Sequence, residues 1–165
     1  GNFWDPRLKS FVQFRGAKTL DASALLMPLV KFIGPNDPRW CSTLGAINRT
    51  LVEGSLVNGY NILEGADTGF PGGEGTFSMC SFWNVECLAR AGDLKLARFY
   101  FEKTLGYANR LGLYSEEIGL NGELLGNFPQ AFTHLGLISA SFNLDKRLDG
   151  APREELLVEN EELPS

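Results

Sequence analysis

Two adjacent helix-forming segments decide the fold, and both lie in residues 74–111, EGTFSMCSFWNVECLARAGDLKLARFYFEKTLGYANRL. The apolar pattern predicts one helix from about Glu74 to Ala91 and a second from about Leu94 to Leu111. Gly92 and Asp93 leave room only for a short turn between them, which makes the two helices antiparallel neighbours. The sequence therefore predicts a helical hairpin in the middle of the chain.

Helical periodicity extends to both sides of this hairpin. It predicts three further helices. The first begins at Asp21, a natural N-cap. The second runs from Pro38 to about Glu53, and the third runs from about Pro129 to Leu144. A possible short strand lies near Leu56–Tyr60, and the segments 54–73 and 113–127 are expected to be loops. We therefore predict an all-α domain of about five helices in residues 21–148. A lead-in (1–20) precedes it, and an acidic, disordered tail (149–165) follows it.

Two of the predicted helices are more apolar than a small bundle requires. The stretches Phe77–Leu88 and Ala131–Phe142 carry apolar side chains nearly all round, and such a helix must be covered on every side. Five helices do not provide that much cover. We therefore expect these faces to pack against helices that this chain lacks.

Composition and charge exclude several classes of function. The net charge is −5 over 165 residues, and residues 150–165 alone contribute −4, so the remaining body carries only −1. A nearly neutral body without a basic cluster argues against nucleic acid and against an anionic membrane as partners. No apolar run approaches the ~20 residues that cross a bilayer, and no export signal is recognisable in the first ten residues. Three cysteines without a CxxC pair indicate free thiols in a reducing compartment, so we expect a cytoplasmic protein.

Cofactor and metal sites are not expected either. The glycine-rich residues 71–76 lack the lysine of a phosphate loop, because no lysine lies between Lys31 and Lys95. His134 is the single histidine, which argues against a transition-metal site. Cys80 or Cys87 with His134 remains open as a thiol hydrolase, although buried structural cysteines are the simpler interpretation.

Acids, amides and aromatic rings in the second half of the chain indicate a carbohydrate site. Glu116 and Glu117 are adjacent in a predicted loop. The rings of Phe77, Trp83, Tyr114 and Phe128 offer flat faces for sugars, and Glu74, Asn127 and Gln130 offer partners for hydroxyl groups. Solvated acids and core aromatics are the competing interpretation of the same residues.

Three segments in this order resemble glycoside hydrolase family 15, the glucoamylase, glucodextranase and prokaryotic trehalase family. They are Glu74-Gly75-Thr76-Phe77-Ser78-Met79-Cys80-Ser81-Phe82-Trp83, Tyr114-Ser115-Glu116-Glu117, and Leu125-Gly126-Asn127-Phe128-Pro129-Gln130-Ala131-Phe132-Thr133-His134. The resemblance covers about residues 20–142 and implies the C-terminal portion of an (α/α)6 barrel. It also implies an inverting α-glycosidase whose substrate, an α-glucoside, is trehalose, a maltooligosaccharide or an α-1,6 glucan.

The resemblance assigns the general base to Glu116. It implies sugar contacts for Glu74, Phe77, Glu117, Asn127 and Gln130. The family's general-acid segment has no counterpart here, and Asn58-Gly59 stands where many relatives carry an arginine. We therefore expect little activity from the chain alone, with the missing N-terminal half or a second copy as its partner. A non-catalytic helical domain that binds carbohydrate or protein is the alternative.

Overall fold

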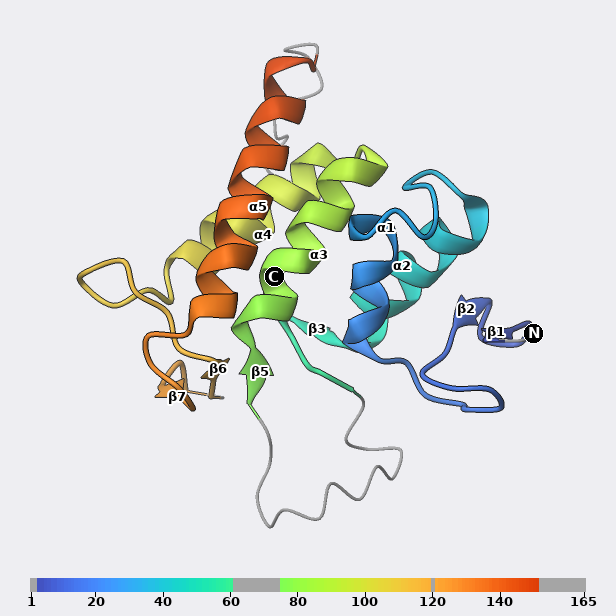
Figure 1. The fold of residues 1–165 in the computed structure, drawn as a ribbon, viewed down its shortest axis with the longest axis horizontal. Helices are drawn as coiled ribbons and strands as arrows, with labels where there is room; N and C mark the ends of the chain where they lie inside the picture. The colour runs from blue at the N-terminus through green and yellow to red at the C-terminus, as the bar shows by residue number, and fades with distance from the viewer. Residues whose placement is uncertain (1–2, 61–74, 120, 152–165) are drawn as a thin grey trace.

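A computed structural model shows a bundle of helices with short strands along its lower edge (Figure 1). It describes residues 3–60, 75–119 and 121–151. Helix α3 (Ser78–Ala91) lies in the centre and packs against α5 (Ala131–Asp149) and α4 (Leu94–Leu105). The 3-10 helix η1 (Ala22–Leu25), α1 (Leu26–Leu29) and α2 (Pro38–Thr50) also contact α3, and they lie on its other side in Figure 1. The predicted helical fold and the central hairpin of α3 and α4 are confirmed.

Several helix limits differ from the predicted ones. Helix α3 begins four residues later than predicted, because Thr76 and Phe77 form strand β5 instead. Helix α4 ends at Leu105 with Gly106 as its C-cap, although the apolar spacing continues to Leu111. Helix α5 continues to Asp149, five residues beyond the predicted end, through a mostly polar and exposed last turn that the apolar spacing does not indicate. None of the helices in the described ranges combines the length and apolar character that a bilayer crossing demands.

The segment after Asp21 is less regular than the predicted helix. Asp21 is the N-cap as expected, because its side chain accepts a 2.7 Å hydrogen bond from the backbone N–H of Ser23. The turns that follow are η1 and the four-residue α1, which contains Pro28. Helix α2 ends at Thr50, three residues before the predicted end.

The expectation of at most one strand is wrong. Seven two-residue strands pair antiparallel in the described residues: β1 (Trp4–Asp5) with β2 (Ser10–Phe11), β3 (Val52–Glu53) with β4 (Leu56–Val57), and β5 (Thr76–Phe77) with β6 (Glu117–Ile118), which also pairs with β7 (Leu124–Leu125). Strand β4 lies within the predicted 56–60 segment. Strands this short carry no alternating pattern, so their pairing is not visible in the sequence.

The core lies between α2, α3 and the start of α1. Trp40, Ile47, Phe82 and Val85 are fully buried there. A polar link crosses the same contact: Asn48 on α2 and Asn84 on α3 exchange two amide hydrogen bonds of 3.0 and 2.9 Å. Because both amides are satisfied by each other, the pair fixes the position of α2 against α3 without an unpaired polar group.

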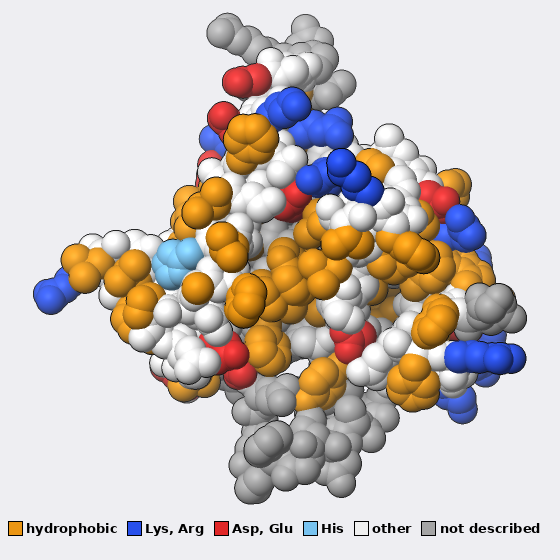
Figure 2. Space-filling model, viewed as in Figure 1, with side chains coloured by type: hydrophobic (Ala, Val, Ile, Leu, Met, Phe, Trp, Pro, Cys, Tyr) orange, Lys and Arg blue, Asp and Glu red, His pale blue; other side chains and the backbone are white. Residues whose placement is uncertain are grey.

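One face of α5 is apolar and uncovered by the rest of the described chain. Phe132, Leu135, Ile138 and Phe142, here called the α5 stripe, are 64%, 61%, 64% and 68% exposed. Their spacing of three to four residues places them on one side of the helix. Figure 2 shows apolar side chains gathered along this helix and around a hollow beside it. Contiguous exposed apolar surface of this kind indicates an interaction site.

Candidate active site

Glu116 and Glu117, two of the three acids of the predicted site, lie in a hairpin, residues 114–130, which leads into α5. In its three-stranded sheet Glu117 lies opposite Phe77 on β5 and opposite Leu125 on β7. The backbone N–H of Ser78 also donates to the carbonyl of Glu116 at 3.0 Å. The sheet therefore holds the hairpin against the N-terminal end of α3.

The carboxylate of Glu116 is held on one side only. Its Oε2 accepts hydrogen bonds from the backbone N–H of Asn127 at 3.1 Å and from the Nδ2 of Asn127 at 3.0 Å. Gly126 makes this approach possible, because a Cβ there would lie 2.9 Å from Oε2, and its φ of 72° suits glycine. No described residue donates a hydrogen bond to the other oxygen, Oε1. The side chain is half-buried, so it is fixed in direction and still reached by solvent.

Glu117 points to a different partner. Its Oε2 accepts a 3.0 Å hydrogen bond from the backbone N–H of Gly75, where β5 begins. A Cβ at Gly75 would lie 2.8 Å from the carbonyl oxygen of Ile118, so only glycine fits this contact. Glu117 thus ties the start of β5 to β6. Glu74, the neighbouring candidate for a sugar contact, lies outside the described residues.

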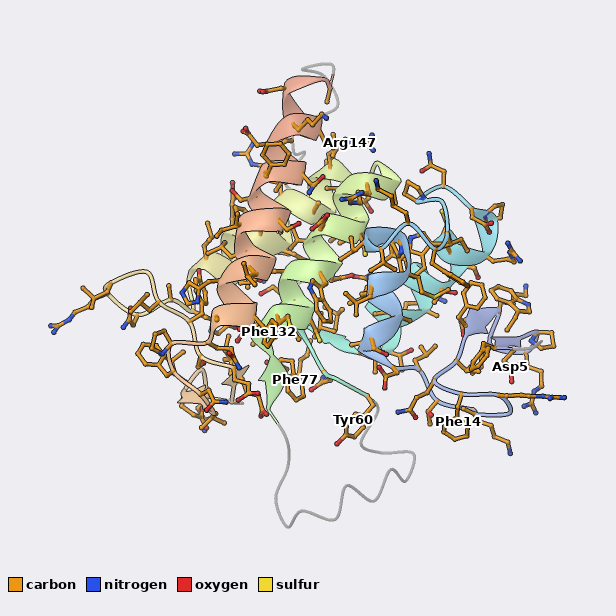
Figure 3. All side chains as sticks on the ribbon, in the orientation of Figure 1. Asp5, Phe14, Tyr60, Phe77, Phe132 and Arg147 are labelled. Atoms are coloured by element: carbon orange, nitrogen blue, oxygen red, sulfur yellow. The ribbon has the colours of Figure 1, made fainter. Side chains whose placement is uncertain are left out.

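Phe77 lies against the segment that follows β4. A Cβ at Gly59 would be 3.2 Å from the Phe77 ring, so this glycine makes room for the ring. The same segment pairs with the N-cap of η1, because Asp21 and Tyr60 form a bridge and the N–H of Ala22 donates to the Gly59 carbonyl at 2.8 Å. Phe77 and Tyr60 lie together at the lower edge of the helices in Figure 3.

His134 fixes the two ends of the hairpin to each other. Its Nδ1 is 2.7 Å from the carbonyl oxygen of Gln130, and its Nε2 is 3.4 Å from the backbone nitrogen of Tyr114. Since Nε2 must accept from the Tyr114 N–H, the ring proton is assigned to Nδ1, which donates to Gln130. The backbone N–H of Gln130 also donates to the Tyr114 carbonyl at 2.9 Å. His134 therefore positions the hairpin.

The predicted aromatic platform is only partly available. Tyr114 is 1% exposed and packs edge-on against Phe82 and His134, so it belongs to the core and offers no face to a sugar. Burial raises the pKa of its phenol. Phe128 is exposed, and Trp83 is half-buried beside α5 rather than beside the hairpin. Of the four predicted rings, Phe77 and Phe128 remain: Phe77 lies opposite Glu117 in the sheet, and Phe128 follows Asn127 in the chain.

The thiol-hydrolase alternative is contradicted. Cys80 and Cys87, the buried thiols, are 6% and 0% exposed. Burial raises the pKa of the Cys80 thiol from 9.0 to about 12 and raises that of Cys87 further. Neither thiol is ionised near neutral pH, and both ring nitrogens of His134 are engaged in the hairpin. Cys41 is exposed.

The hairpin therefore brings together Glu116, Glu117, Phe77 and Asn127, with Gln130 at its closing end. Gly75 and Gly126, which let these groups approach, lie within the family-like segments, but neither was predicted as a site residue. Glu86, a buried acid on α3, was also missed; its signal is an acid four residues before Arg90 inside an apolar stretch. In the described residues no group of three or more His, Cys, Asp or Glu side chains is placed to hold a metal.

Sequence relatives match most of the chain. A trehalase of Thermoplasma acidophilum is 43% identical over 145 residues, which is 87% of this chain and 24% of the relative. A trehalase of Mycobacterium tuberculosis is 48% identical over 131 residues, which is 79% of this chain and 19% of the relative. This chain is similar in sequence to trehalases. No family model matches it. The resemblance to the glucoamylase and trehalase family is thereby confirmed, and the chain spans about a quarter or less of the length of these trehalases.

Solved structures have a similar fold. A glycosidase variant in complex with glucose superimposes with a TM-score of 0.69 at 19% identity, over 83% of this chain and 39% of that one. A wild-type glycosidase gives a TM-score of 0.63 at 21% identity, over 87% of this chain and 40% of that one. The predicted fold, a portion of a helical barrel, is confirmed.

Proposed function

We propose that the chain is part of an inverting α-glycosidase and that Glu116 is its general base. The trehalases and glycosidases that it resembles support hydrolysis of a glucoside as the reaction. The geometry of Glu116 carries the specific role. Asn127 holds Oε2 through two N–H donors, and Oε1 has no donor among the described residues.

Such a carboxylate suits water activation. Inversion needs a water between the base and the anomeric carbon, and the two catalytic carboxyl groups are therefore ~6.5–9.5 Å apart. Oε1 of Glu116 accepts one proton from this water while the water oxygen attacks the anomeric carbon. A carboxylic acid on the other side of the sugar protonates the leaving oxygen. Phe77, Glu117, Asn127 and Gln130 are proposed to contact the sugar around the water.

The acid is proposed to come from the remaining part of the protein. The described residues hold no counterpart of the family's acid segment, and the relatives extend over far more chain than is present here. General acid catalysis contributes about 10²–10⁴-fold. The chain alone is therefore expected to hydrolyse glucosides at most at a trace rate, and the proposed partner is the missing part of the same fold.

A complementation assay tests this proposal. The chain is mixed with the part of the Thermoplasma acidophilum trehalase that lies outside the matched region, and glucose release from trehalose and maltose is followed. Glu116→Gln is expected to reduce turnover at least 10²-fold. Glu123→Gln is the matched control, because Glu123 is an exposed acid of the same hairpin. Unchanged turnover with Glu116→Gln would exclude the proposed base, and full turnover by the chain alone would exclude the proposal that the acid comes from the remaining part of the protein.

A non-catalytic binding domain is the second candidate, favoured by the exposed α5 stripe. It predicts that the mixture binds glucosides or polypeptide without releasing glucose, and that Glu116→Gln leaves this binding unchanged. Calorimetric titration with trehalose, beside the same glucose assay, separates the two functions.

A further inference from the structure

One imidazole connects helix α5 to the strand that carries Glu116. His134 lies in the first turn of α5, and its Nδ1 is 2.7 Å from the carbonyl oxygen of Gln130. Its Nε2 is 3.4 Å from the backbone nitrogen of Tyr114. A neutral imidazole has one donor and one acceptor, which is what a carbonyl and an N–H require, whereas a protonated one has two donors. Both contacts can therefore form only when the ring is neutral and carries its proton on Nδ1.

The N–H that the ring accepts belongs to the same short ladder as the proposed base. The carbonyl of Tyr114 accepts a 2.9 Å hydrogen bond from the N–H of Gln130. Two residues further along, the N–H of Glu116 donates to the carbonyl of Asn127, also at 2.9 Å. Asn127 in turn donates its backbone N–H and its Nδ2 to Oε2 of Glu116. A shift of Tyr114 away from Gln130 is therefore expected to move Glu116 against the residue that orients its carboxylate.

Thr133 holds the same strand without a titratable group. Its Oγ1 donates to the carbonyl of Ser115 at 3.1 Å, and both residues are fully buried. Thr133 precedes His134 in α5, and Ser115 follows Tyr114 in the hairpin, so two adjacent side chains of one helical turn hold two adjacent residues of the strand. Of these two side chains only the imidazole can change its charge. Thr133 therefore provides an internal control for the effect of the ring's proton.

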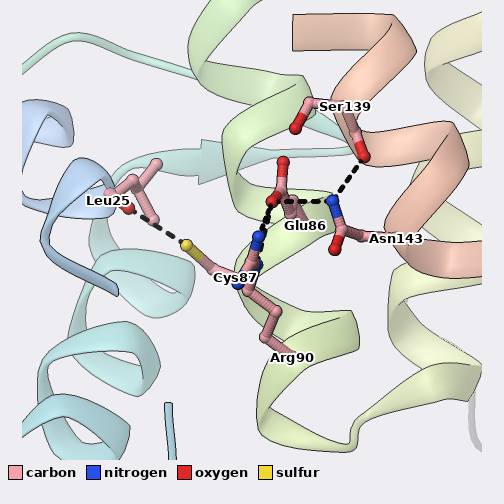
Figure 4. A network of polar contacts seen from close by, with 6 residues as sticks. All are labelled: Leu25, Glu86, Cys87, Arg90, Ser139 and Asn143. Atoms are coloured by element: carbon pink, nitrogen blue, oxygen red, sulfur yellow. Dashed lines mark hydrogen bonds and ion pairs between the residues drawn. The ribbon is translucent and has the colours of Figure 1, made fainter. Parts of the chain in front are cut away.

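Helix α5, which carries both side chains, is itself fixed on α3. Nδ2 of Asn143 donates to Oε1 of the buried Glu86 at 3.0 Å, and Arg90 donates to the same oxygen from Nε and Nη2 (Figure 4). Nearer the hairpin, a Cβ at Gly136 would lie only 3.4 Å from the Cβ of Phe82, so the two helices are also in close contact there. Release of the imidazole contact is therefore expected to displace the hairpin and not the helix.

Few charged groups surround the imidazole. Helix α5 has no charged residue between Ala131 and Asn143. The phenol of Tyr114 packs edge-on against the ring, and its hydroxyl donates to the carbonyl of Leu105 at 3.2 Å. The ion pairs of the described ranges include neither the ring nor Arg110, the charged residue of the segment after α4. The acids of the hairpin accept hydrogen bonds elsewhere: Glu116 from Asn127, Glu117 from Gly75 and Glu123 from Asn121.

We propose that His134 is a positioning residue for Glu116 and that it acts only as the neutral imidazole with its proton on Nδ1. When the ring takes up a second proton, the Tyr114 N–H loses its acceptor and faces a donor, and the ladder that aligns Glu116 with Asn127 loosens. The ring, rather than protonation of the Glu116 carboxylate, thereby sets the acid limit of turnover. This role rests on the proposed function, because it affects catalysis only if Glu116 is the base.

Nuclear magnetic resonance of the isotope-labelled chain tests the geometry directly, because the chain has a single histidine. The neutral ring is expected to carry its proton on Nδ1. On acidification, the amide signals of Tyr114 and Asn127 are expected to shift along the same curve as protonation of the ring. The Asn127 shift should persist in Glu116→Gln, which has no carboxylate to titrate at that position. A proton on Nε2 of the neutral ring, or ring protonation that leaves Asn127 unchanged, would overturn the inference.

Two substitutions separate the acceptor from the charge. His134→Gln places an amide oxygen near the position of Nε2, so it can accept from Tyr114 but cannot be protonated. His134→Asn places an amide donor near the position of Nδ1 and lacks the acceptor. In the complementation assay, His134→Asn is expected to lower kcat about 10–100-fold with KM nearly unchanged, because a misplaced base impairs only the chemical step. His134→Gln is expected to be the milder variant and to lose the fall in turnover that follows ring protonation.

Thr133→Val is the matched control, because it loosens the same strand without removing a titratable group. It is expected to lower turnover without moving the pH at which turnover falls. Circular dichroism establishes that each variant is folded. An acid fall that is identical in His134→Gln and the unmodified chain would overturn the inference, as would one that Thr133→Val moves equally.

Failure of this inference is distinct from failure of the proposed function. Turnover that requires Glu116 but falls identically in His134→Gln supports the base and refutes the role of His134. Ring protonation that shifts Asn127, together with turnover that is unchanged in Glu116→Gln, supports the positioning by His134 and refutes the base.

Discussion

Gly126→Ala is expected to dislodge the carboxylate of Glu116 from its position. An L-residue in the left-handed region costs about 1–2 kcal/mol, and Gly126 has φ 72°. The new methyl group would also meet Glu116 Oε2 at 2.9 Å and its Cβ at 3.0 Å, so the carboxylate must leave both N–H donors of Asn127. Because Asn127 is exposed, we assign about 1 kcal/mol to these two bonds together. The free energy of unfolding should fall by about 2–3 kcal/mol.

Gly112→Ala isolates the contact from the backbone strain. Gly112 has φ 75°, and a Cβ there would meet nothing within 4 Å, so this substitution should cost only about 1–2 kcal/mol. Urea unfolding followed by circular dichroism measures both. In a Glu116→Ala background, Gly126→Ala should cost about 1 kcal/mol less than in the unmodified chain. Equal costs at the two glycines, with no coupling to Glu116, would refute the contact between Gly126 and the proposed base.

Three further outcomes follow from the polar and thiol groups. Arg90→Met should lower the free energy of unfolding by about 2–3 kcal/mol, because it leaves the buried Glu86 carboxylate without its cation. The loss is smaller than for a fully buried pair, since the Arg90 side chain is 27% exposed. Arg98→Met removes an exposed ion pair with Glu102 at the same spacing and should cost under about 0.5 kcal/mol in the same urea titration. Native alkylation should modify Cys41 alone and denaturant should expose all three thiols, as counted by mass spectrometry; rapid native labelling of the buried thiols would contradict their burial. The pKa of each buried thiol is higher in the folded chain than in the unfolded chain. This contribution to the free energy of unfolding is therefore full below about pH 9 and falls toward pH 12, by up to about 1.4 kcal/mol per pH unit for each thiol. Cys80→Ala should make this fall less steep.

The helices were predictable because their apolar spacing is local, and their ends were not. Helix α4 ends with Gly106 as its C-cap although Ala108 and Leu111 continue the apolar face, so the apolar spacing alone does not mark this end. The start of α3 depends on the pairing of Thr76 with Ile118, which lies forty-two residues away in the chain. No local window of sequence contains that information.

The candidate site was predictable as a set of residues but not as a geometry. The three family-like segments placed Glu116 and Asn127 in the sequence, whereas their hydrogen bonds depend on the turn at Gly126. Tyr114 was expected to contact the sugar but lies in the core. The sequence of a motif does not distinguish an aromatic ring that packs inside the protein from one that faces a ligand. The pairing of Glu86 with Asn143 joins two helices and is equally invisible to local spacing.

The hairpin is closed at its base, and this has a consequence for related sequences. His134 and the Tyr114–Gln130 backbone bond fix both ends, and the tip turns between Gly119 and Glu123 through a 2.9 Å hydrogen bond. Homologues can therefore lengthen or shorten that tip without changing the position of Glu116, the proposed general base. Length variation in an alignment should accumulate between Gly119 and Glu123, while the segment from Gly126 to His134 should tolerate no gaps.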